Sequence, residues 1–440
     1  MTSLPLPLTR DALVEAYRGY GRPREQWLVG AELERHLLGP DGWPAPYFGD
    51  HGVRWLMERL AEEGWKPKFE GENPIALFKD GASVTLEPGG QFELSGRPHR
   101  DVQGVYDEAA AFAGAVSRLQ ADTPFRQSAL GFTPFARVAD IGWVPKGRYV
   151  VMRAHMSTSG ELGHHMMKGT CATQASYDFS DEADCRAKVE LSIRVAPLIT
   201  AMFANSPLTE GRPNGWQSFR GYIWTQTDPA RTGFPEAAEA FGFEAWVDYL
   251  LDVPMMFVAP GGQWRPANGL TFRAWMRHGD ADGVFPTWND WDLHQTSVFP
   301  EVRVKHLIEM RMADCVSVPE VAAFSALFSG LLYGAAGTAA ADDFSRRFTA
   351  NGDQAQRFLL ACKDGLRASH DGRAYADWAS ELVALARAGL ERWNPSDVHF
   401  LDALAARVAR AETPADALLA SLNGDYRPAR VLSATAPLPG

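Results

Sequence analysis

The chain has 440 residues, 46% of them hydrophobic and 22% charged, which suffices to bury the core of one large domain or two closely packed ones. Its formal net charge of −11 argues against a nucleic-acid groove as its main purpose. No basic segment followed by a long apolar core stands at the N-terminus, and we find no apolar run of the ~18–20 residues that a membrane helix needs. We therefore expect no signal peptide, no membrane partner and a cytoplasmic location. The cysteines show no CxxC or CxxH spacing, which argues against a zinc site or a disulfide scaffold; they are Cys171, Cys185, Cys315 and Cys362.

The predicted elements are those of an α+β protein. Runs of strands with interspersed helices, rather than strict strand–helix alternation, favour an antiparallel or mixed sheet. We predict a single domain over residues 1–440, with its core at about 25–335. In chain order we expect a helix at 8–20 capped by Thr9, a strand at 26–34, a helix near 50–63, a hairpin of 75–79 and 83–87 turning at Asp80-Gly81, a helix at 101–120, mixed elements over about 128–310, a mostly helical part over 318–432 and a disordered tail at 433–440.

Two short segments each place carboxylates on one face of a strand. In the stretch that begins at Glu87, the side chains of Glu87, Gln91 and Glu93 point to one side, because successive side chains alternate in an extended chain. Glu32 and Glu34 repeat the arrangement two residues apart. Carboxylates on the same side repel one another unless a cation lies between them, and a divalent cation with oxygen ligands is the usual solution. An ordinary solvated strand face is the alternative.

A third segment, residues 301–312, is expected to form one strand with apolar even positions and charged odd positions. Three such strands on one sheet would gather carboxylates beside cationic side chains. Mg²⁺ is held by carboxylates together with phosphate oxygens, and Arg or Lys neutralises the remaining phosphate charge. The pattern therefore indicates a metal–polyphosphate site. The charged side chains of this third segment are Glu301, Arg303, Lys305, Glu309 and Arg311.

Several motifs resemble those of the plant-type glutamate–cysteine ligase family, and they run in the family's order over roughly residues 25–335. The most specific is Leu86-Glu-Pro-Gly-Gly-Gln-Phe-Glu-Leu-Ser-Gly96. The others are Val144-Pro-Lys-Gly-Arg-Tyr149, Phe203-Ala-Asn-Ser-Pro-Leu-Thr-Glu-Gly-Arg-Pro-Asn-Gly215, Ile223-Trp-Thr-Gln-Thr-Asp228, Tyr249-Leu-Leu-Asp-Val-Pro-Met255, Asn289-Asp-Trp-Asp-Leu-His294, Phe299-Pro-Glu-Val-Arg303 and Ile308-Glu-Met-Arg311.

The resemblance implies a glutamine-synthetase-like catalytic fold, a curved antiparallel sheet with ATP and Mg²⁺ on its carboxylate face. It also implies a reaction in which ATP activates the γ-carboxylate of glutamate as an acyl phosphate, which the amino group of a second amino acid then attacks. The implied Mg²⁺ ligands are Glu32, Glu34, Glu87, Glu93 and Glu309. Arg311 would hold phosphate oxygens, and Arg148, Gln174, Arg220 and Trp224 would form the amino-acid pocket, with Arg311 and Arg220 the implied catalytic residues. A structural ion pair is the alternative for each arginine.

The chain departs from the family pattern where the family has Arg-Thr-Cys-Thr-Val-Gln-Val-Asn and this sequence has Gly169-Thr-Cys-Ala-Thr-Gln-Ala-Ser176. A family tyrosine is Met256 here. Loss of polar groups at Gly169, Ala172, Ser176 and Met256 should change which acceptor is rejected. We therefore expect a diverged member that accepts a small apolar amino acid, for example the alkyne-bearing propargylglycine, at least as well as cysteine. An ordinary glutamate–cysteine ligase of glutathione biosynthesis is the alternative.

Two other function classes fit less well. A guanidino kinase shares the Arg–Mg²⁺ chemistry but forms no peptide bond, and the ligase motifs here run in order. A non-catalytic sensor would not need the full set of carboxylates and arginines. The expected partners are the small-molecule substrates alone, with no nucleic acid and no membrane, and the sequence leaves a monomer or a homodimer open.

Overall fold

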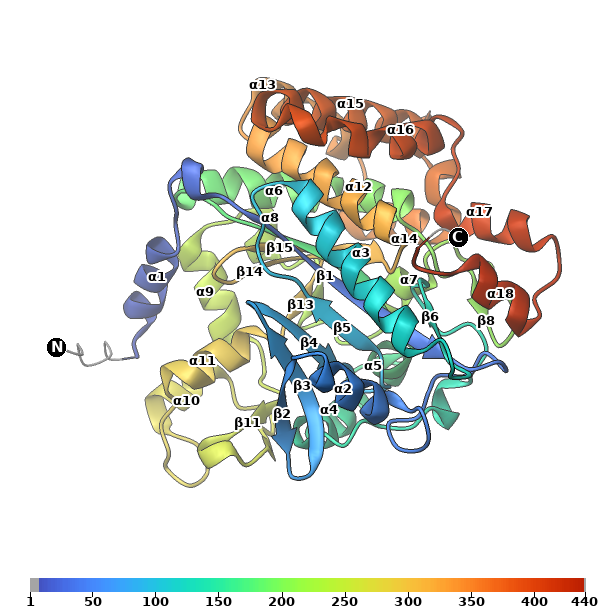
Figure 1. Ribbon diagram of the computed structural model, residues 1–440. Coiled ribbons are helices and arrows are strands. Elements are labelled where there is room, and N and C mark those ends of the chain that lie inside the picture. Colours follow the sequence, from blue (N-terminus) through green and yellow to red (C-terminus); the bar gives the residue numbers. More distant parts are fainter. Residues whose placement is uncertain (1–7, 439–440) are drawn as a thin grey trace.

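The computed structural model describes residues 8–438. At its centre lies a nine-stranded sheet with strand order β14-β15-β7-β1-β5-β4-β3-β2, and β6 pairs with the end of β1 (Figure 1). The pairings within this sheet are antiparallel, which confirms the predicted α+β class. Its strands are β1 (Val29–Leu38), β2 (Lys66–Glu70), β3 (Asn73–Lys79), β4 (Ala82–Leu86), β5 (Phe92–Ser95), β6 (Arg126–Ser128), β7 (Ala172–Tyr177), β14 (Val302–Val304) and β15 (Ile308–Asp314).

The segment that begins at Glu87 is a hairpin end rather than the one strand expected. Leu86 lies opposite Phe92 in the β4–β5 pair, and the backbone N–H of Glu87 donates to the carbonyl of Gln91 at 2.8 Å. Gly90, with φ at 91°, adopts the left-handed conformation that this turn requires. Glu87 and Glu93 therefore come from neighbouring strands, which still places both on the same face of the sheet.

Residues 301–312 are likewise two strands and not one. A turn at 305–307 separates β14 from β15, and Arg303 lies directly opposite Glu309. These two residues are six positions apart, so the odd positions stay on one face after the chain reverses. Alternation alone therefore could not reveal the turn.

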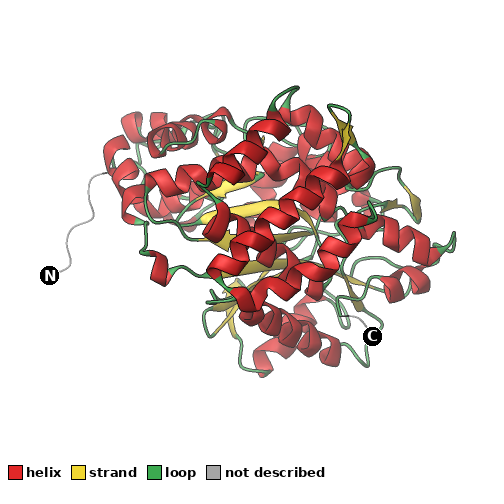
Figure 2. Ribbon diagram, turned by 90° about the horizontal axis from the view of Figure 1, so that it is seen from above, coloured by secondary structure: helices red, strands yellow, loops and turns green. Residues whose placement is uncertain are grey.

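Helices cover the apolar face of the sheet. α2 (Val53–Glu62), α3 (Val102–Leu119), α6 (Glu182–Met202) and α12 (Val318–Ser329) pack there, and Figure 2 shows the strands enclosed by helices. α3 buries Val105, Ala109, Ala113 and Val116, whose spacing of three or four residues defines one side of a helix. The opposite face of the sheet carries the polar side chains.

One helix in the described residues, Val318–Ala335, is long and apolar enough to cross a membrane, with a mean hydropathy of 1.3. The nearby run from Val321 to Ala341 is broken by Ser and Gly, and it is expected from the sequence to form a buried helix. It consists of α12 and a continuing π-helical turn, Gly330–Ala335. Inside the protein, 83% of this segment is buried. It packs between α3, α15 (Tyr375–Trp393) and the sheet, as the core helix of a globular protein does.

The C-terminal tail is packed as far as the structure describes it, contrary to the disorder expected from residue 433. The backbone N–H of Ala129 donates to the carbonyl of Thr435 at 2.8 Å, and that of Val318 donates to Pro437 at 2.8 Å. Thr435 is itself buried. These bonds satisfy backbone groups that would otherwise be unpaired, which explains why a Pro-containing segment is held in place. Residues 439–440 of the expected tail lie outside the described residues.

The remaining helices and strands flank this centre. Thr9 caps the first helix as predicted, its hydroxyl accepting from Ala12 N at 3.2 Å. The others are α1 (Arg10–Gly19), α4 (Gly147–Met156), α5 (Gly163–Gly169), α7 (Phe219–Thr225), α8 (Glu236–Glu239), α9 (Phe243–Asp252), α10 (Phe272–His278), α11 (Trp288–Gln295), α13 (Ala339–Thr349), α14 (Gln354–Asp364), α15 (Tyr375–Trp393), α16 (Asp402–Ala409), α17 (Pro414–Leu422), α18 (Pro428–Ala434), and the short strands β8 (Leu208–Thr209), β9 (Arg212–Pro213), β10 (Thr232–Gly233), β11 (Phe257–Val258), β12 (Arg265–Pro266), β13 (Phe299–Pro300), β16 (Ser369–His370) and β17 (Arg373–Ala374).

Candidate active site

A cavity of about 270 Å³ lies on the polar face of the sheet, under α4, α5 and α7. Strands β1, β5, β7 and β15 and the β4–β5 turn supply one wall, and the three helices supply the other. Most of the predicted site residues lie together around this cavity. Those that line this cavity are Glu32, Glu34, Glu87, Glu93, Arg148, Gln174, Arg220, Trp224 and Arg311.

The carboxylates of the sheet wall lie close together and are half-buried. Glu34 and Glu93 are opposite each other on β1 and β5. Burial, and next the charge of Glu93, raises the pKa of Glu32 to about 8 and that of Glu34 well above its ordinary value. Burial, and next the charge of Glu87, raises the pKa of Glu93. Groups that hold protons so tightly repel one another when ionised, and a cation between them would remove that cost.

Hydrogen bonds fix two of these carboxylates in place. The backbone N–H of Ala172 donates to Glu34 Oε2 at 2.6 Å. The Thr85 hydroxyl donates to Glu93 Oε2 at 3.0 Å, and the Ser95 hydroxyl donates to Oε1 at 3.3 Å. Both side chains are thus oriented toward the cavity by the strands that flank them.

Glu309 differs from the other four carboxylates. Arg303 donates to both of its oxygens, at 2.8 and 2.9 Å, and Arg311 Nη1 donates to Oε1 at 2.8 Å. Burial alone would raise the pKa of Glu309, but Arg303, Lys305 and Arg311 hold it well below its ordinary value. Glu309 is 2% exposed and is not among the cavity-lining residues. Its predicted role as a metal ligand stays a prediction, and in this arrangement it orients Arg311.

The carboxylates around the cavity fit only some kinds of metal site. Within residues 8–438, no group of three or more His, Cys, Asp or Glu side chains is gathered so as to hold a metal ion. Mg²⁺, however, usually takes one or two carboxylates and completes its octahedron with water and phosphate oxygens. The paired carboxylates around Glu93 fit an ion of that kind, bound together with a polyphosphate. They do not fit an ion enclosed by protein ligands alone.

The helical wall supplies hydrogen-bond donors that lack partners. Arg148 Nε, Arg220 Nε and Trp224 Nε1 are all buried and make no hydrogen bond within the protein. Arg220 is only 3% exposed, and its Nη2 donates to the carbonyl of Arg311 at 2.9 Å. Buried donors are almost always paired in native proteins. Three such donors around one cavity therefore indicate an anionic ligand that brings its own oxygens, as a carboxylate or a phosphate does.

The sequence analysis did not assign a site role to several other lining residues. Lys146 is one of them, and burial, and next the charge of Arg148, lowers its pKa to about 8. It stands in the same motif as Arg148, and Arg303 and Lys305 share the charged odd positions of their segment, so a signal existed for these three. Five more stand inside the motifs quoted above without having been given a role, and they are Pro88, Ser95, Tyr149, Thr170 and Phe299. The rest carried no recognisable signal, and they are Thr85, Met152, Met166, Met167 and Thr296.

Three residues predicted to bind substrate, Ala172, Ser176 and Met256, are not among those that line the cavity. Ala172 presents its backbone N–H to Glu34 instead. Ser176 lies opposite Glu309, beyond the cavity along β7, and Met256 is buried just before β11.

The Gly169 substitution also lies away from the cavity. A Cβ at position 169 would come within 2.4 Å of the ring of Phe132, so this ring fills the space that a side chain would need.

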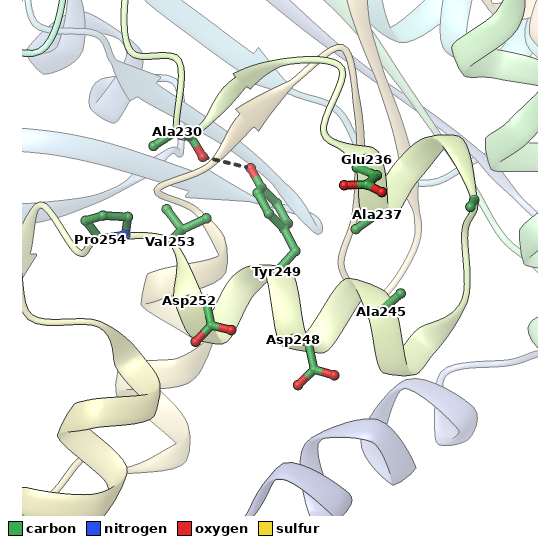
Figure 3. A pocket seen from close by; sticks show the side chains of 10 residues that line it. Ala230, Glu236, Ala237, Ala245, Asp248, Tyr249, Asp252, Val253 and Pro254 are labelled. Atoms are coloured by element: carbon green, nitrogen blue, oxygen red, sulfur yellow. Dashed lines mark hydrogen bonds between the residues drawn. The ribbon is translucent and has the colours of Figure 1, made fainter.

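A second, more open cavity of about 560 Å³ lies between α8 and α9 (Figure 3). Alanines line much of it, and the Tyr249 hydroxyl points across it and donates to the carbonyl of Ala230 at 3.4 Å. Two of its carboxylates, Asp248 and Asp252, are paired with Arg273. None of the predicted site residues lies there.

Comparisons with known proteins identify the family of the chain. The family model described as glutamate-cysteine ligase family 2 (GCS2) matches residues 28–429. The chain is 38% identical over 430 residues to the chloroplastic glutamate–cysteine ligase of Brassica juncea, with 96% of this chain and 82% of the relative covered. It is 37% identical over 434 residues to that of Arabidopsis thaliana, covering 96% and 81%. These relatives are named chloroplastic, which contradicts the cytoplasmic location expected from the sequence, so that prediction is wrong.

Solved structures show the same fold at low identity. The glutamate–cysteine ligase of Francisella tularensis, in complex with AMP, superposes with a TM-score of 0.61 at 14% identity, over 93% of this chain and 87% of that one. A bifunctional glutathione synthetase from Pasteurella multocida gives 0.54 at 11% identity, over 98% of this chain and 54% of that one. From the family match and the curated relatives, the chain belongs to glutamate-cysteine ligase family 2 and is an ATP-dependent ligase.

Proposed function

We propose that this ligase joins the γ-carboxylate of L-glutamate to the α-amino group of a small L-amino acid, through a γ-glutamyl phosphate formed from ATP. The observation that carries the proposal is the cavity itself, where half-buried carboxylates face buried arginine and tryptophan donors that have no partner. A single domain over residues 1–440 would carry the activity, as a monomer or a homodimer. One apolar cluster extends through both the sheet and the C-terminal helices, which supports the single domain.

In this proposal, the sheet wall of the cavity binds Mg²⁺ and ATP, and the helical wall binds the amino-acid substrates. Glu32, Glu34, Glu87 and Glu93 would hold Mg²⁺, which when bound neutralises phosphate charge and aligns ATP. Arg311, held by Glu309 at 2.8 Å, would stabilise the negative charge that develops on the transferred phosphoryl group.

On the helical wall, Arg148 and Arg220 would each pair with a substrate carboxylate, because the planar guanidinium matches two carboxylate oxygens. Positioning the acyl phosphate next to the amine then supplies most of the remaining acceleration. Closing the cavity against water protects the acyl phosphate from hydrolysis.

The acceptor is cysteine in the first form of this proposal, in keeping with the names of the relatives. A small apolar amino acid, such as propargylglycine, is the second form. It is supported by the apolar wall that Met152, Met166 and Phe299 give the cavity. Thioethers adapt to the shape of a ligand and offer almost no hydrogen bonding, so this wall suits a thiol and an alkyne alike. One apolar group is worth only about 1–3 kcal/mol of discrimination, so we expect overlap between similar acceptors.

A panel of small L-amino acids, each incubated with glutamate, ATP and Mg²⁺, tests the proposal through the mass of the product and the release of ADP. A γ-glutamyl dipeptide with ADP supports the ligase. ADP release with a guanidino compound and no dipeptide would instead indicate a kinase, and no ADP with any pair would indicate a sensor. A hundredfold preference for cysteine in kcat/KM over every apolar acceptor would overturn the second form.

A further inference from the structure

A fully buried carboxylate, Asp314, lies behind the cavity at the end of β15 and does not line it. Its side chain is 0% exposed. Oδ2 accepts from the backbone N–H of Asn205 at 2.7 Å and from the Ser206 hydroxyl at 2.6 Å, while Oδ1 accepts from the Ser218 hydroxyl at 2.8 Å. A buried carboxylate is retained only when its hydrogen bonds are satisfied, so these three donors define its position.

The partners of Asp314 hold the first turn of α7. Ser218 is the N-cap of this helix and accepts from the backbone N–H of Gly221 at 3.0 Å. Ser206 accepts from the backbone N–H of Arg220 at 3.0 Å. Two of the N–H groups that a helix start leaves unpaired are thus bonded to hydroxyls that Asp314 orients.

The same carboxylate acts on the Arg220 side chain more directly. Arg220 Nη1 lies 4.0 Å from Asp314 Oδ1, and Nη2 donates to the carbonyl of Arg311 on the same strand. A Cβ on Gly131 would come within 2.6 Å of Asp314 Cγ, so the carboxylate also has no room to move on that side. Strand β15 and helix α7 are therefore locked together at this point.

From these contacts we infer that Asp314 is a positioning residue for the amino-acid subsite, which fixes Arg220 and Trp224 at the cavity through the first turn of α7. The inference rests on the proposed function, in which Arg220 binds a substrate carboxylate. A bidentate contact is sensitive to displacement, and an error of about 1 Å can cost about a hundredfold in rate. ATP, which lies against the sheet carboxylates in the proposal, should not depend on this contact.

The test is Asp314→Asn, which keeps the shape of the side chain but removes its charge and one acceptor. We expect the KM of one amino-acid substrate, glutamate or the acceptor, to rise about tenfold or more, with the KM of ATP changed less than about twofold. The matched control is Asp397→Asn. Asp397 is also buried and accepts from a backbone N–H, that of Val102 at 3.0 Å, but it lies outside the cavity. The Asp397→Asn variant should lower Tm and leave the KM of each substrate unchanged.

The Ser218→Ala variant tests the same inference independently, and it can be used even if Asp314→Asn fails to fold. It removes the cap between Asp314 and α7 and should raise the same KM, and the double variant should raise it no further than the larger single effect. Effects that multiply, or a KM for ATP that rises equally, would overturn the positioning role. Unchanged KM values in folded Asp314→Asn would overturn it too. A wild-type chain that forms no γ-glutamyl product would instead refute the proposed function.

Discussion

Replacing Arg220 with lysine keeps the positive charge of the helical wall but removes its planar pair of donors. In the structure, Nη2 already donates to the carbonyl of Arg311 at 2.9 Å, and Nε is buried without a partner. A lysine ammonium group cannot keep the hydrogen bond to the carbonyl of Arg311 and also donate to two oxygens of a substrate carboxylate. Losing one charge-assisted hydrogen bond costs about 1.5–3 kcal/mol. Since each 1.36 kcal/mol is a factor of ten, kcat/KM should fall about 10- to 150-fold.

The assay for Arg220→Lys is the initial rate of ADP release while glutamate and the acceptor are varied in turn. Arg410→Lys is the matched control, since Arg410 also donates twice to a carboxylate, Glu412, but its side chain is 63% exposed. A surface pair of that kind contributes about 0–1 kcal/mol, so this variant should keep the wild-type rate. A kcat/KM for Arg220→Lys within threefold of the wild type for both amino acids would refute a substrate-binding role for its donors.

Three further predictions concern the cavity and the buried carboxyl groups near it. Glu93→Gln should lower kcat about a hundredfold or more while Tm stays close to that of the wild type, because it removes a charge from the metal site and keeps its shape; near-normal turnover would exclude Glu93 as a ligand. Burial raises the pKa of Glu32 to about 8 and of Glu301 to about 7, so the folded metal-free protein holds protons that the unfolded chain releases near its ordinary value of 4.5. Its free energy of unfolding should therefore fall as pH rises from about 5 to 8 in urea titrations, and a profile that rises there would contradict this. ADP release with glutamate alone should be slow and increase on addition of an acceptor, since the acyl phosphate is shielded from water; rapid release without one would count against the mechanism.

The common face of the carboxylates could be predicted from the sequence, because the alternation of side chains with a period of two continues through a hairpin. Glu87 and Glu93 were assigned to one strand and lie on two, yet both face the cavity, since the turn between them preserves parity. The pair Arg303 and Glu309 behaves in the same way. Alternation therefore identifies the face of a side chain even where it misplaces the end of a strand.

The helical wall was harder to predict, because the period of a helix identifies its buried side but not what lies opposite. Met152 and Met166 line the cavity, but in the sequence each resembles any buried methionine. Arg148 and Arg220 were assigned only through the resemblance to a family. Asp314 could not be assigned a role from the sequence, because its three donors come from segments about a hundred residues away along the chain.

The choice of acceptor shows how far substitutions in a motif can be interpreted without a structure. Gly169 replaces a family arginine, but Phe132 fills the space beside it. Ala172 bonds to Glu34 through its backbone N–H, and Ser176 lies opposite Glu309 in the strand register. None of these positions forms the wall of the cavity, so their changes can act on the acceptor only by shifting neighbours such as Gln174, which does line it. Side chains that touch the ligand determine which ligands are rejected. The selectivity of this chain for its acceptor should therefore depend first on Met152, Met166 and Phe299. A cavity wall of these side chains is compatible with both cysteine and a small apolar amino acid.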